Sequence, residues 1–379
     1  MNSSLDTAFT TFQVISQSAD SNFVFSPLSL VCSLLMILFG ARGPTAVELG
    51  SAVFRTDDQF VALNITASTV LRLRDLLHRL SHSNGTTLSN NVFIDRNFHL
   101  TPDFILSTKE FFKANIASID FADKKAKKTI NELIGASSQH DLQNALEYLS
   151  PNTKLLLLNI MIFRREWKYK FDLRRSKKRP FLTQEGGQVL ADSMVLTNTI
   201  ETGMSEELNC TAVKLPFRGG ALSFIVFLPR PGTRVEQLIS NLSAGSVRLL
   251  LEKKMQRSKT KLIIPKFRME WSDSLVQPLR RIGINRIFDA QYANFTGISE
   301  HSSGLFVGDL RQKVVLSIDE NGSRASAATS ASFRQRSLSL EDEFIVNRPF
   351  VFMIGLFNSP NRKTLTDVLF MGKYLSPPA

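Results

Sequence analysis

Residues 313–357 read KVVLSIDENGSRASAATSASFRQRSLSLEDEFIVNRPFVFMIGLF, two apolar runs separated by a polar segment. The runs at 313–318 and 344–357 are rich in β-branched and aromatic residues, which indicates strands. Residues 319–339 are mainly small, polar and basic, and they have almost nothing to bury. A connection of this length inside a compact domain usually carries a function, so this segment is the first candidate site.

If the chain from residue 323 onward became a strand, alternate side chains would face opposite sides of a sheet. One side would carry Ser323, Ala325, Ala327, Thr329, Ala331 and Phe333, all of them uncharged. The other side, which includes Ala328, would carry both charges, Arg324 and Arg334. Gly322 gives the backbone freedom to turn at the start. The pattern predicts a segment that can enter a sheet, and the alternative is an exposed, flexible Ser/Ala-rich loop.

The rest of the chain predicts helices first and strands afterwards. Apolar residues at helical spacing predict helices at 7–18, 27–40, 61–80, 101–114 and 125–135. Ser26 is the expected N-cap of the second helix and Gly40 its terminator. Apolar, β-rich runs predict strands at LSNNVFID, KLLLLNIMIF, TAVKLPF, LSFIVFLP, KLIIPKFRM and TDVLFMGKY. No repeat or low-complexity linker divides the chain, which favours a single α+β domain over residues 1–379.

No pattern of catalytic, metal-binding or cofactor-binding residues occurs in the sequence. The histidines are His78, His82, His99, His140 and His301, and none of them lies in HExxH or beside a Cys or carboxylate at ligand spacing. The GxSxG, GxGxxG and Walker A patterns do not occur either. We therefore expect a protein that is not an enzyme and holds no metal or cofactor.

Charge and sequons bear on partners and compartment. The formal net charge of +12 favours polyanionic partners, although no base-reading motif accompanies it, which argues against sequence-specific nucleic-acid binding. The apolar run 28–39 is too short to span a membrane. Sequons occur at Asn2, Asn64, Asn84, Asn209, Asn241, Asn294 and Asn321 and favour secretion, whereas the start MNSSLDTAFTTF lacks a signal-peptide pattern. We expect an extracellular or cell-surface protein, with a cytoplasmic one as the alternative.

Six motifs along the whole chain resemble the serpins, the large serine-protease-inhibitor family. They are NFVFSPLSLVCSLLMILFGARGPTAVEL (22–49), LLLLNIMIFRREWKYKFD (155–172), LIIPKF (262–267), GINRIFDAQYANFTGIS (283–299), FIVNRPFVFMI (344–354) and FMGKYLSP (370–377). The resemblance implies the serpin fold, with a helical subdomain and three β-sheets. It also implies a large central sheet A, an exposed reactive-centre loop at 320–343, and a monomer.

The resemblance implies a suicide-substrate mechanism. A serine protease attacks the loop and forms an acyl-enzyme. The cut loop then enters sheet A as a new strand and carries the protease about 55 Å, which distorts its catalytic site before deacylation. Strain in a metastable fold drives this step. The family's interval from Glu320 to the scissile residue ends at Arg336, which implies cleavage of Arg336–Ser337 by a trypsin-like protease, with Arg334 as the competing site.

The resemblance also assigns residues to the opening of the sheet. The hinge comprises Glu320, Gly322, Ser323, Ala325, Ala327, Ala328 and Thr329. Lys266 and Glu320 match an ion pair close to Trp167 where the loop enters the sheet, a place called the breach. Ser26, Ser29, Asn159 and Gln312 match a buried polar cluster called the shutter, in which the family often has a histidine at the position of Gln312. Asn321 begins a sequon whose glycan would obstruct insertion.

Basic runs give a second candidate site, because the helix-D region of some serpins binds heparin. The candidate residues are Arg72, Arg74, Arg79, Lys124, Lys125, Lys127, Lys128, Arg174, Arg175, Lys177, Lys178 and Arg179. Sulfates attract such clusters by counterion release, so heparin or heparan sulfate is the expected partner and accelerator. The alternative is a solvated basic surface.

Three other functions compete with that of an inhibitor. The first is a non-inhibitory serpin that acts as a carrier or chaperone. Bulky or charged hinge residues would favour it, and the alanines argue against it. The second is a glycan-binding or chromatin-associated protein, and the third a hydrolase.

Overall fold

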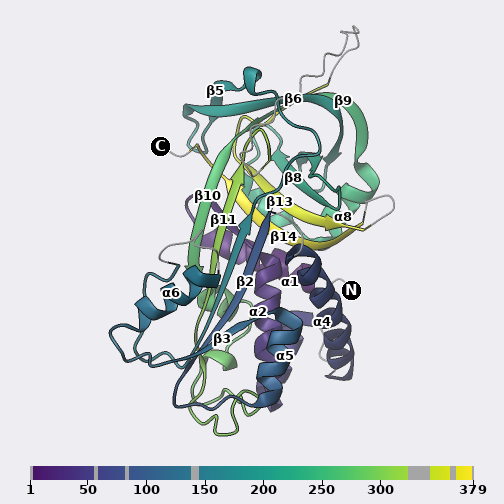
Figure 1. Ribbon diagram of the computed structural model, residues 1–379. Helices are drawn as coiled ribbons and strands as arrows, with labels where there is room; N and C mark the ends of the chain where they lie inside the picture. Colours follow the sequence, from purple (N-terminus) through teal and green to yellow (C-terminus); the bar gives the residue numbers. More distant parts are fainter. Residues whose placement is uncertain are drawn as a thin grey trace. The chain divides into compact units, whose positions relative to one another are not determined.

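The structure is a computed structural model, and it describes residues 3–54, 59–81, 85–137, 145–322, 342–358 and 364–377 (Figure 1). The α-helices are α1 (Ser3–Ser18), α2 (Pro27–Gly40), α3 (Gly43–Phe54), α4 (Gln59–Ser81), α5 (Pro102–Phe112), α6 (Ala126–Ser137), α7 (Val235–Asn241), α8 (Ala244–Leu249) and α9 (Val276–Arg281). The strands are β1 (Phe23–Phe25), β2 (Thr86–Asp95), β3 (Asn115–Ile119), β4 (Leu155–Phe163), β5 (Lys177–Leu182), β6 (Gln188–Ser205), β7 (Cys210–Pro216), β8 (Leu222–Pro229), β9 (Gln256–Pro265), β10 (Phe267–Ser274), β11 (Val307–Ile318), β12 (Asp342–Ile345), β13 (Phe350–Phe357) and β14 (Leu365–Tyr374). Short turns of helix occur at Leu173–Arg175, Leu250–Lys254 and Arg286–Phe288.

The chain forms two compact units, each assembled from separate segments. The first unit contains Met1–Ile15, Phe25–Ile162 and Trp271–Val314. The second contains Ser16–Val24, Phe163–Glu270 and Val315–Ala379. Because each unit draws on three stretches of sequence, no single linker separates them, in keeping with the lack of a linker in the sequence.

Helix α2 lies in the core of the first unit. Its sequence PLSLVCSLLMILFG is apolar on every side, which is the pattern of a buried helix, and nearly all of its residues are buried. The Ser26 side chain caps the helix by accepting a hydrogen bond from the Ser29 amide at 3.2 Å, as predicted. Helices α4 and α5 lie beside α2 (Figure 1).

Helix α2 ends at Gly40, as predicted, but Gly40 does not act as a left-handed cap. Gly40 is the last residue of the helix, and the cap that follows is Ala41 in an extended conformation. The Ile298 side chain occupies the space that a Cβ of Gly40 would need. A glycine is therefore required at this position for close packing and not for a left-handed turn.

The first of the two hydrogen-bonded sheets formed by the described residues has the strand order β10-β11-β4-β2-β3. Strand β4 is buried along its whole length, as its run of apolar residues predicts. Strands β11 and β4 are direct hydrogen-bonded neighbours, and β11 leads into residue 319, where the polar segment begins. The insertion that the resemblance implies would separate this pair of strands.

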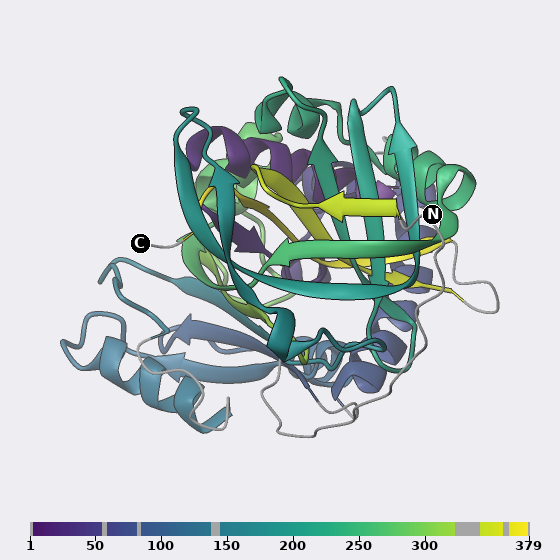
Figure 2. The ribbon, with the colours of Figure 1, turned by 90° about the horizontal axis from the view of Figure 1, so that it is seen from above.

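The second sheet has the order β1-β14-β13-β8-β7-β6-β9-β12, with β5 paired to β6. Strands β5, β6 and β9 run side by side in Figure 1 and Figure 2. Residues Ser193–Thr202 of β6 pair with β9, and Glu201–Ser205 pair with β7. Because one long strand belongs to both networks, two of the three expected sheets appear as a single hydrogen-bonded sheet.

The helix boundaries differ from the predicted ones by a few residues, and some short helices were not predicted. The helix predicted at 101–114 begins after the N-cap Thr101 and ends before Lys113, which has φ 51°. Helix α3 has the sequence GPTAVELGSAVF, whose glycines and proline conceal its helical spacing. Within the described residues, no helix is both long and apolar enough to cross a membrane.

Candidate functional site

The hinge residues that the structure describes form a tight turn at 319–322. The Asp319 amide donates to the Gly322 carbonyl at 2.7 Å, and the Gly322 amide donates to the Asp319 carbonyl at 3.1 Å. The Asp319 carboxylate also accepts from the amides of Asn321 and Gly322, at 2.9 and 3.1 Å. Gly322 has φ 127°, and an added Cβ would overlap the Arg165 carbonyl. Only glycine fits this position without strain.

The Trp167 segment, residues 166–171, holds this turn with three hydrogen bonds from nitrogen donors. The Trp167 amide donates to the Asn321 carbonyl at 3.0 Å, and the Trp167 indole Nε1 donates to the Asp319 carbonyl at 2.7 Å. The Phe171 amide donates to the Glu320 carbonyl at 3.0 Å. Trp167 is 2% exposed and stacks on Phe217 with ring centroids 4.5 Å apart. A buried, well-packed residue therefore anchors the turn from which the polar segment leaves.

The predicted partners Lys266 and Glu320 are close in space. Lys266 Nζ lies 3.5 Å from Glu320 Oε1, and the two side chains are 39% and 8% exposed. Burial acts to raise the pKa of Glu320, but the adjacent Ser176 hydroxyl, the Glu320 backbone amide and Lys266 outweigh it and hold the pKa below its usual value. Burial raises the pKa of Asp319, against the hydrogen bonds from the two amides. The two neighbouring carboxyl groups thus have pKa values shifted in opposite directions.

Two of the predicted shutter residues, Ser26 and Gln312, form a closed pair. Gln312 Oε1 accepts from the Ser26 amide at 2.6 Å, and Gln312 Nε2 donates to the Ser26 carbonyl at 2.8 Å. Both residues are at most 1% exposed. The Ser26 and Ser29 hydroxyl groups also contact Met161 Sδ, at 2.9 and 3.5 Å. The side-chain amide thus links β11 to the N-terminus of α2 inside the first unit.

Asn159 bonds to residues that were not predicted as part of the shutter. Its side chain accepts from the Ser33 hydroxyl and donates to Asn90 Oδ1. Asn90 in turn donates to the Phe112 carbonyl at 2.7 Å. The serines of α2 recur at helical spacing on one face, and Asn90 interrupts an apolar strand, so the sequence carried a signal for both residues.

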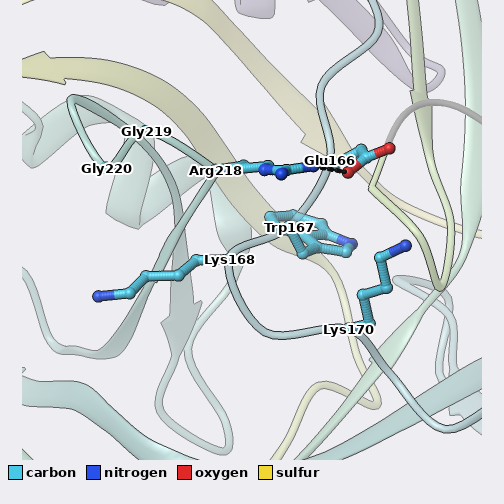
Figure 3. A pocket seen from close by; sticks show the side chains of 7 residues that line it. All are labelled: Glu166, Trp167, Lys168, Lys170, Arg218, Gly219 and Gly220. Carbon is cyan, nitrogen blue, oxygen red and sulfur yellow. Dashed lines mark hydrogen bonds and ion pairs between the residues drawn. The ribbon is translucent and has the colours of Figure 1, made fainter. Parts of the chain in front are cut away.

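A surface cavity lies on the outer side of the Trp167 segment (Figure 3). Its volume is ≈ 530 Å³, and it is lined by Glu166, Trp167, Lys168, Lys170, Arg218, Gly219 and Gly220. Arg218 and Glu166 form an ion pair at 3.1 Å. No sequence pattern groups these residues, because the two segments that meet here are far apart in the chain.

Comparison with known proteins identifies the family. The family model described as "Serpin (serine protease inhibitor)" matches residues 2–377. The chain belongs to the serpin family. The family is one of protease inhibitors and not of catalytic enzymes.

Relatives of this serpin match over nearly their whole length. The leukocyte elastase inhibitor of Sus scrofa is 29% identical over 97% of this chain and 96% of its own. Iripin-3 of Ixodes ricinus is 31% identical over 95% of this chain and 90% of its own. The crystal structure of native protease nexin-1 with heparin has a TM-score of 0.82 and is 25% identical, over 99% of this chain and 98% of its own. The serpin fold predicted from the sequence is therefore confirmed.

Several predicted site residues of this serpin lie outside the described residues. They are the hinge residues Ser323, Ala325, Ala327, Ala328 and Thr329 and the scissile pair Arg336 and Ser337. The described strand that follows them, β12, pairs in parallel with β9. Lys261 Nζ lies 2.6 Å from Glu343 across this pair of strands.

The basic residues of the serpin fall into three groups on separate elements. On α4, Arg74 pairs with Asp75 at 3.2 Å and Arg79 donates to the Asp75 carbonyl, while Arg72 is half-buried. Lys124, Lys125, Lys127 and Lys128, at and just before the start of α6, are all exposed. Around the start of β5, Arg174, Arg175, Lys177 and Lys178 are exposed and Arg179 is half-buried. The first two groups belong to one unit and the third to the other.

Proposed function

We propose that this serpin is a suicide-substrate inhibitor of trypsin-like serine proteases that is cleaved at Arg336–Ser337. The observation that carries the proposal is the strand order, in which β11 and β4 are direct neighbours. The polar segment leaves the end of β11 through a turn that the Trp167 segment holds with hydrogen bonds. The alternating pattern of uncharged side chains after Gly322 suits a segment that later enters between these two strands.

In the proposed reaction, the catalytic groups that break the first bond are those of the protease. Its serine hydroxyl attacks the Arg336 carbonyl carbon, its histidine takes the hydroxyl proton, and the same proton passes to the Ser337 nitrogen as that amine leaves. The products are an ester between the protease and Arg336 and a free chain starting at Ser337. An arginine at this position suits a specificity pocket that carries a carboxylate.

Incubation with trypsin, followed by denaturing electrophoresis and mass spectrometry, tests the proposal. We expect a complex that survives denaturation and a released peptide that starts at Ser337. Arg336→Ala should abolish the complex with trypsin, whereas the matched variant Arg334→Ala should leave it intact.

Two results would contradict the proposal in different ways. A complex lost in Arg334→Ala but kept in Arg336→Ala would move the scissile bond by two residues. Clean cleavage without a complex would favour the non-inhibitory alternative, a carrier or chaperone whose loop is only a substrate.

A second proposed activity is binding of heparin-like glycosaminoglycans, with acceleration of inhibition. Two observations favour it: the exposed basic residues at α6 and at the start of β5, and the similarity to protease nexin-1, whose structure contains heparin. Sulfate groups bind such clusters through counterion release. The basic residues of α4 contribute less, because Arg74 and Arg79 already bond to Asp75.

Heparin affinity chromatography separates the two exposed groups. One variant replaces Lys124, Lys125, Lys127 and Lys128 by Gln, and its matched control replaces Arg174, Arg175, Lys177 and Lys178. Both lose four positive charges, so a specific site lowers the eluting salt concentration in one variant more than in the other. Equal shifts would indicate a solvated basic surface without a site.

A further inference from the structure

The cavity beside the Trp167 segment has no part in the proposed inhibitory mechanism. Its volume of ≈ 530 Å³ lies within the range of pockets that hold small molecules. One wall is the backbone of Gly219 and Gly220, which have no side chains. The space beside Gly219 is open, because a Cβ added there would meet nothing within 4 Å. A second cavity of ≈ 130 Å³ shares Lys168 and Gly220 with the first and continues toward Arg257. The two together form an elongated depression within the second unit.

The lining of the larger cavity carries an excess of positive charge. Arg218 is paired with Glu166, the only carboxylate of the lining. Lys168 and Lys170 are exposed and form no ion pair with another described residue. Lys168 Nζ lies 5.2 Å from the ring centroid of Tyr169, a contact that leaves the ammonium open to solvent. Two available ammonium groups therefore attract anions into the cavity.

The directions of the lysine side chains indicate which shape of ligand fits the cavity. Figure 3 shows Lys168 and Lys170 extending to opposite sides of Trp167, while Arg218 reaches toward Glu166. A single compact ion would meet one ammonium group and leave the other unused. A molecule with anionic groups at both ends of a short scaffold can meet both.

We propose that this cavity binds a small, elongated polyanion bearing phosphate or sulfate groups between Lys168 and Lys170. The segment that forms the floor also holds the hinge turn, through the Trp167 amide and indole and the bridge between Glu166 and Gly322. A ligand bound across Lys168 and Lys170 stabilises this segment and so raises the barrier to release of the turn. This second consequence rests on the proposed inhibitory function, whereas the binding itself does not.

Trp167 is a built-in reporter for the ligand. The chain contains two tryptophans, so Trp271→Phe leaves Trp167 as the sole emitter. We would titrate this variant at low salt with linear tripolyphosphate and, separately, with sucrose octasulfate, using inorganic phosphate as the compact comparator. We expect a saturable change of Trp167 fluorescence with the two elongated probes that weakens as salt is added. Calorimetric titration of the unsubstituted chain provides the same constants without the Trp271 change.

Matched double variants decide whether the site is specific. Lys168→Gln/Lys170→Gln should weaken binding by about tenfold or more, the loss expected for two exposed charge contacts. Lys253→Gln/Lys254→Gln removes the same charge from exposed residues of the helical turn at Leu250–Lys254 and should bind as the parent does. Equal weakening in both variants, or no saturable change at all, would overturn the proposal.

The consequence for inhibition is measured separately. The bound probe should slow formation of the denaturation-stable complex with trypsin in the parent and leave the rate of Lys168→Gln/Lys170→Gln unchanged. An unchanged rate in the parent, with binding intact, would overturn the coupling. Because the titration uses no protease, a failure to inhibit trypsin would leave the binding result standing.

Discussion

Gln312 makes with Ser26 the two hydrogen bonds that a neighbouring strand would make. Its carbonyl accepts from the Ser26 amide and its amino group donates to the Ser26 carbonyl. Both main-chain groups are buried. The Ser26 carbonyl also accepts from the Leu30 amide at 3.1 Å, so the Ser26 amide is the group that would be costly to leave unpaired. An imidazole cannot replace this amide fully, because its donor and acceptor nitrogens point away from each other.

We predict that Gln312→His makes stability depend on pH between 5 and 7. Burial lowers the pKa of a histidine, so the folded state binds the proton more weakly than the unfolded state does. Stability is then full above the unfolded pKa of about 6.5 and falls as pH decreases, by at most about 1.4 kcal/mol per pH unit. Denaturant midpoints at several pH values measure the effect, with Gln256→His on the exposed part of β9 as the control. Equal pH profiles for the two variants would refute the prediction.

The carboxyl groups of Asp319 and Glu320 should have opposite effects on stability. The pKa of Glu320 is lowered in the folded state, so its contribution is present above the usual value of 4.5 and is lost as pH falls through the folded pKa. Glu320→Gln should therefore cost about 1 kcal/mol at pH 7, with the difference from the parent shrinking below about pH 4.

Asp319→Asn is the counterpart of that variant. The pKa of Asp319 is raised, so its contribution is present below the usual value of 3.8 and is lost as pH rises through the folded pKa. Asparagine keeps the oxygen that accepts from the amides of Asn321 and Gly322, so this variant should lose nothing at pH 7. Thermal midpoints between pH 3.5 and 7 should show opposite trends. Parallel trends in the two variants would contradict the assignment.

Among the elements, the turn at 319–322 depends most on a single residue type. Gly322→Ala would combine an unfavourable φ with an overlap against the Arg165 carbonyl, and its Cβ would lie 2.8 Å from the Glu166 Cα. We predict a loss of about 2 kcal/mol in the free energy of unfolding, measured by denaturant titration. Gly186 has φ 84°, and a Cβ added there would meet nothing within 4 Å. Gly186→Ala therefore measures the free-energy cost of the unfavourable φ alone. If the two variants lose the same amount, the overlap plays no part.

The sequence pattern predicted correctly the elements that are buried along nearly their whole length. Helix α2 and strand β4 are apolar almost throughout, and both lie where the sequence predicted them. Helix α3 was missed because glycine and proline obscure its spacing, although its packing against α2 and α4 compensates for their low propensity. Local propensity could not reveal a helix that tertiary contacts stabilise.

The sequence predicted which residues belong to the candidate site, but it did not predict all of their hydrogen-bond partners. The ion-pair partners Lys266 and Glu320 are adjacent because they lie next to the ends of the neighbouring strands β10 and β11, and the resemblance had assigned this pair. Asn159 was expected with Ser26 and Ser29, yet it bonds to Ser33 and Asn90. Alternation on β4 fixes the face of the sheet, but the depth and rotation of α2 decide which serine reaches it.

At the scale of the whole molecule, the proposed mechanism requires that the uncut state stores free energy. Strands β11 and β4 pair directly, and the proposed mechanism separates them to admit a new strand between them. Insertion would replace the hydrogen bonds between β11 and β4 by hydrogen bonds on both sides of the new strand, which is a net gain. The uncut state is then held by a kinetic barrier, to which the Trp167 segment and the pair of Lys266 and Glu320 contribute.

We predict that cleavage after Arg336 makes the protein more resistant to heat. About ten added backbone hydrogen bonds, at about 1 kcal/mol each, should raise the midpoint of thermal unfolding by about 12 °C, because unfolding a chain of 379 residues has an entropy of about 0.8 kcal/mol per degree. Calorimetry of the chain before and after limited proteolysis measures the shift. No rise after complete cleavage would mean that the cut segment does not enter the sheet.

The alternating pattern of the segment supplies the matched control for this experiment. Ala327 belongs to the side on which every residue from 323 to 333 is uncharged, whereas Ala328 belongs to the side that already carries Arg324 and Arg334. Ala327→Glu would bury an unpaired charge on insertion, and Ala328→Glu would add a charge where charges are already present. Both variants should be cut after Arg336, because glutamate creates no new site for trypsin, but only Ala328→Glu should gain heat resistance. The same difference should appear in complex formation with trypsin, because insertion is the step that traps the protease, and equal behaviour of the two variants would remove the basis for the proposed insertion.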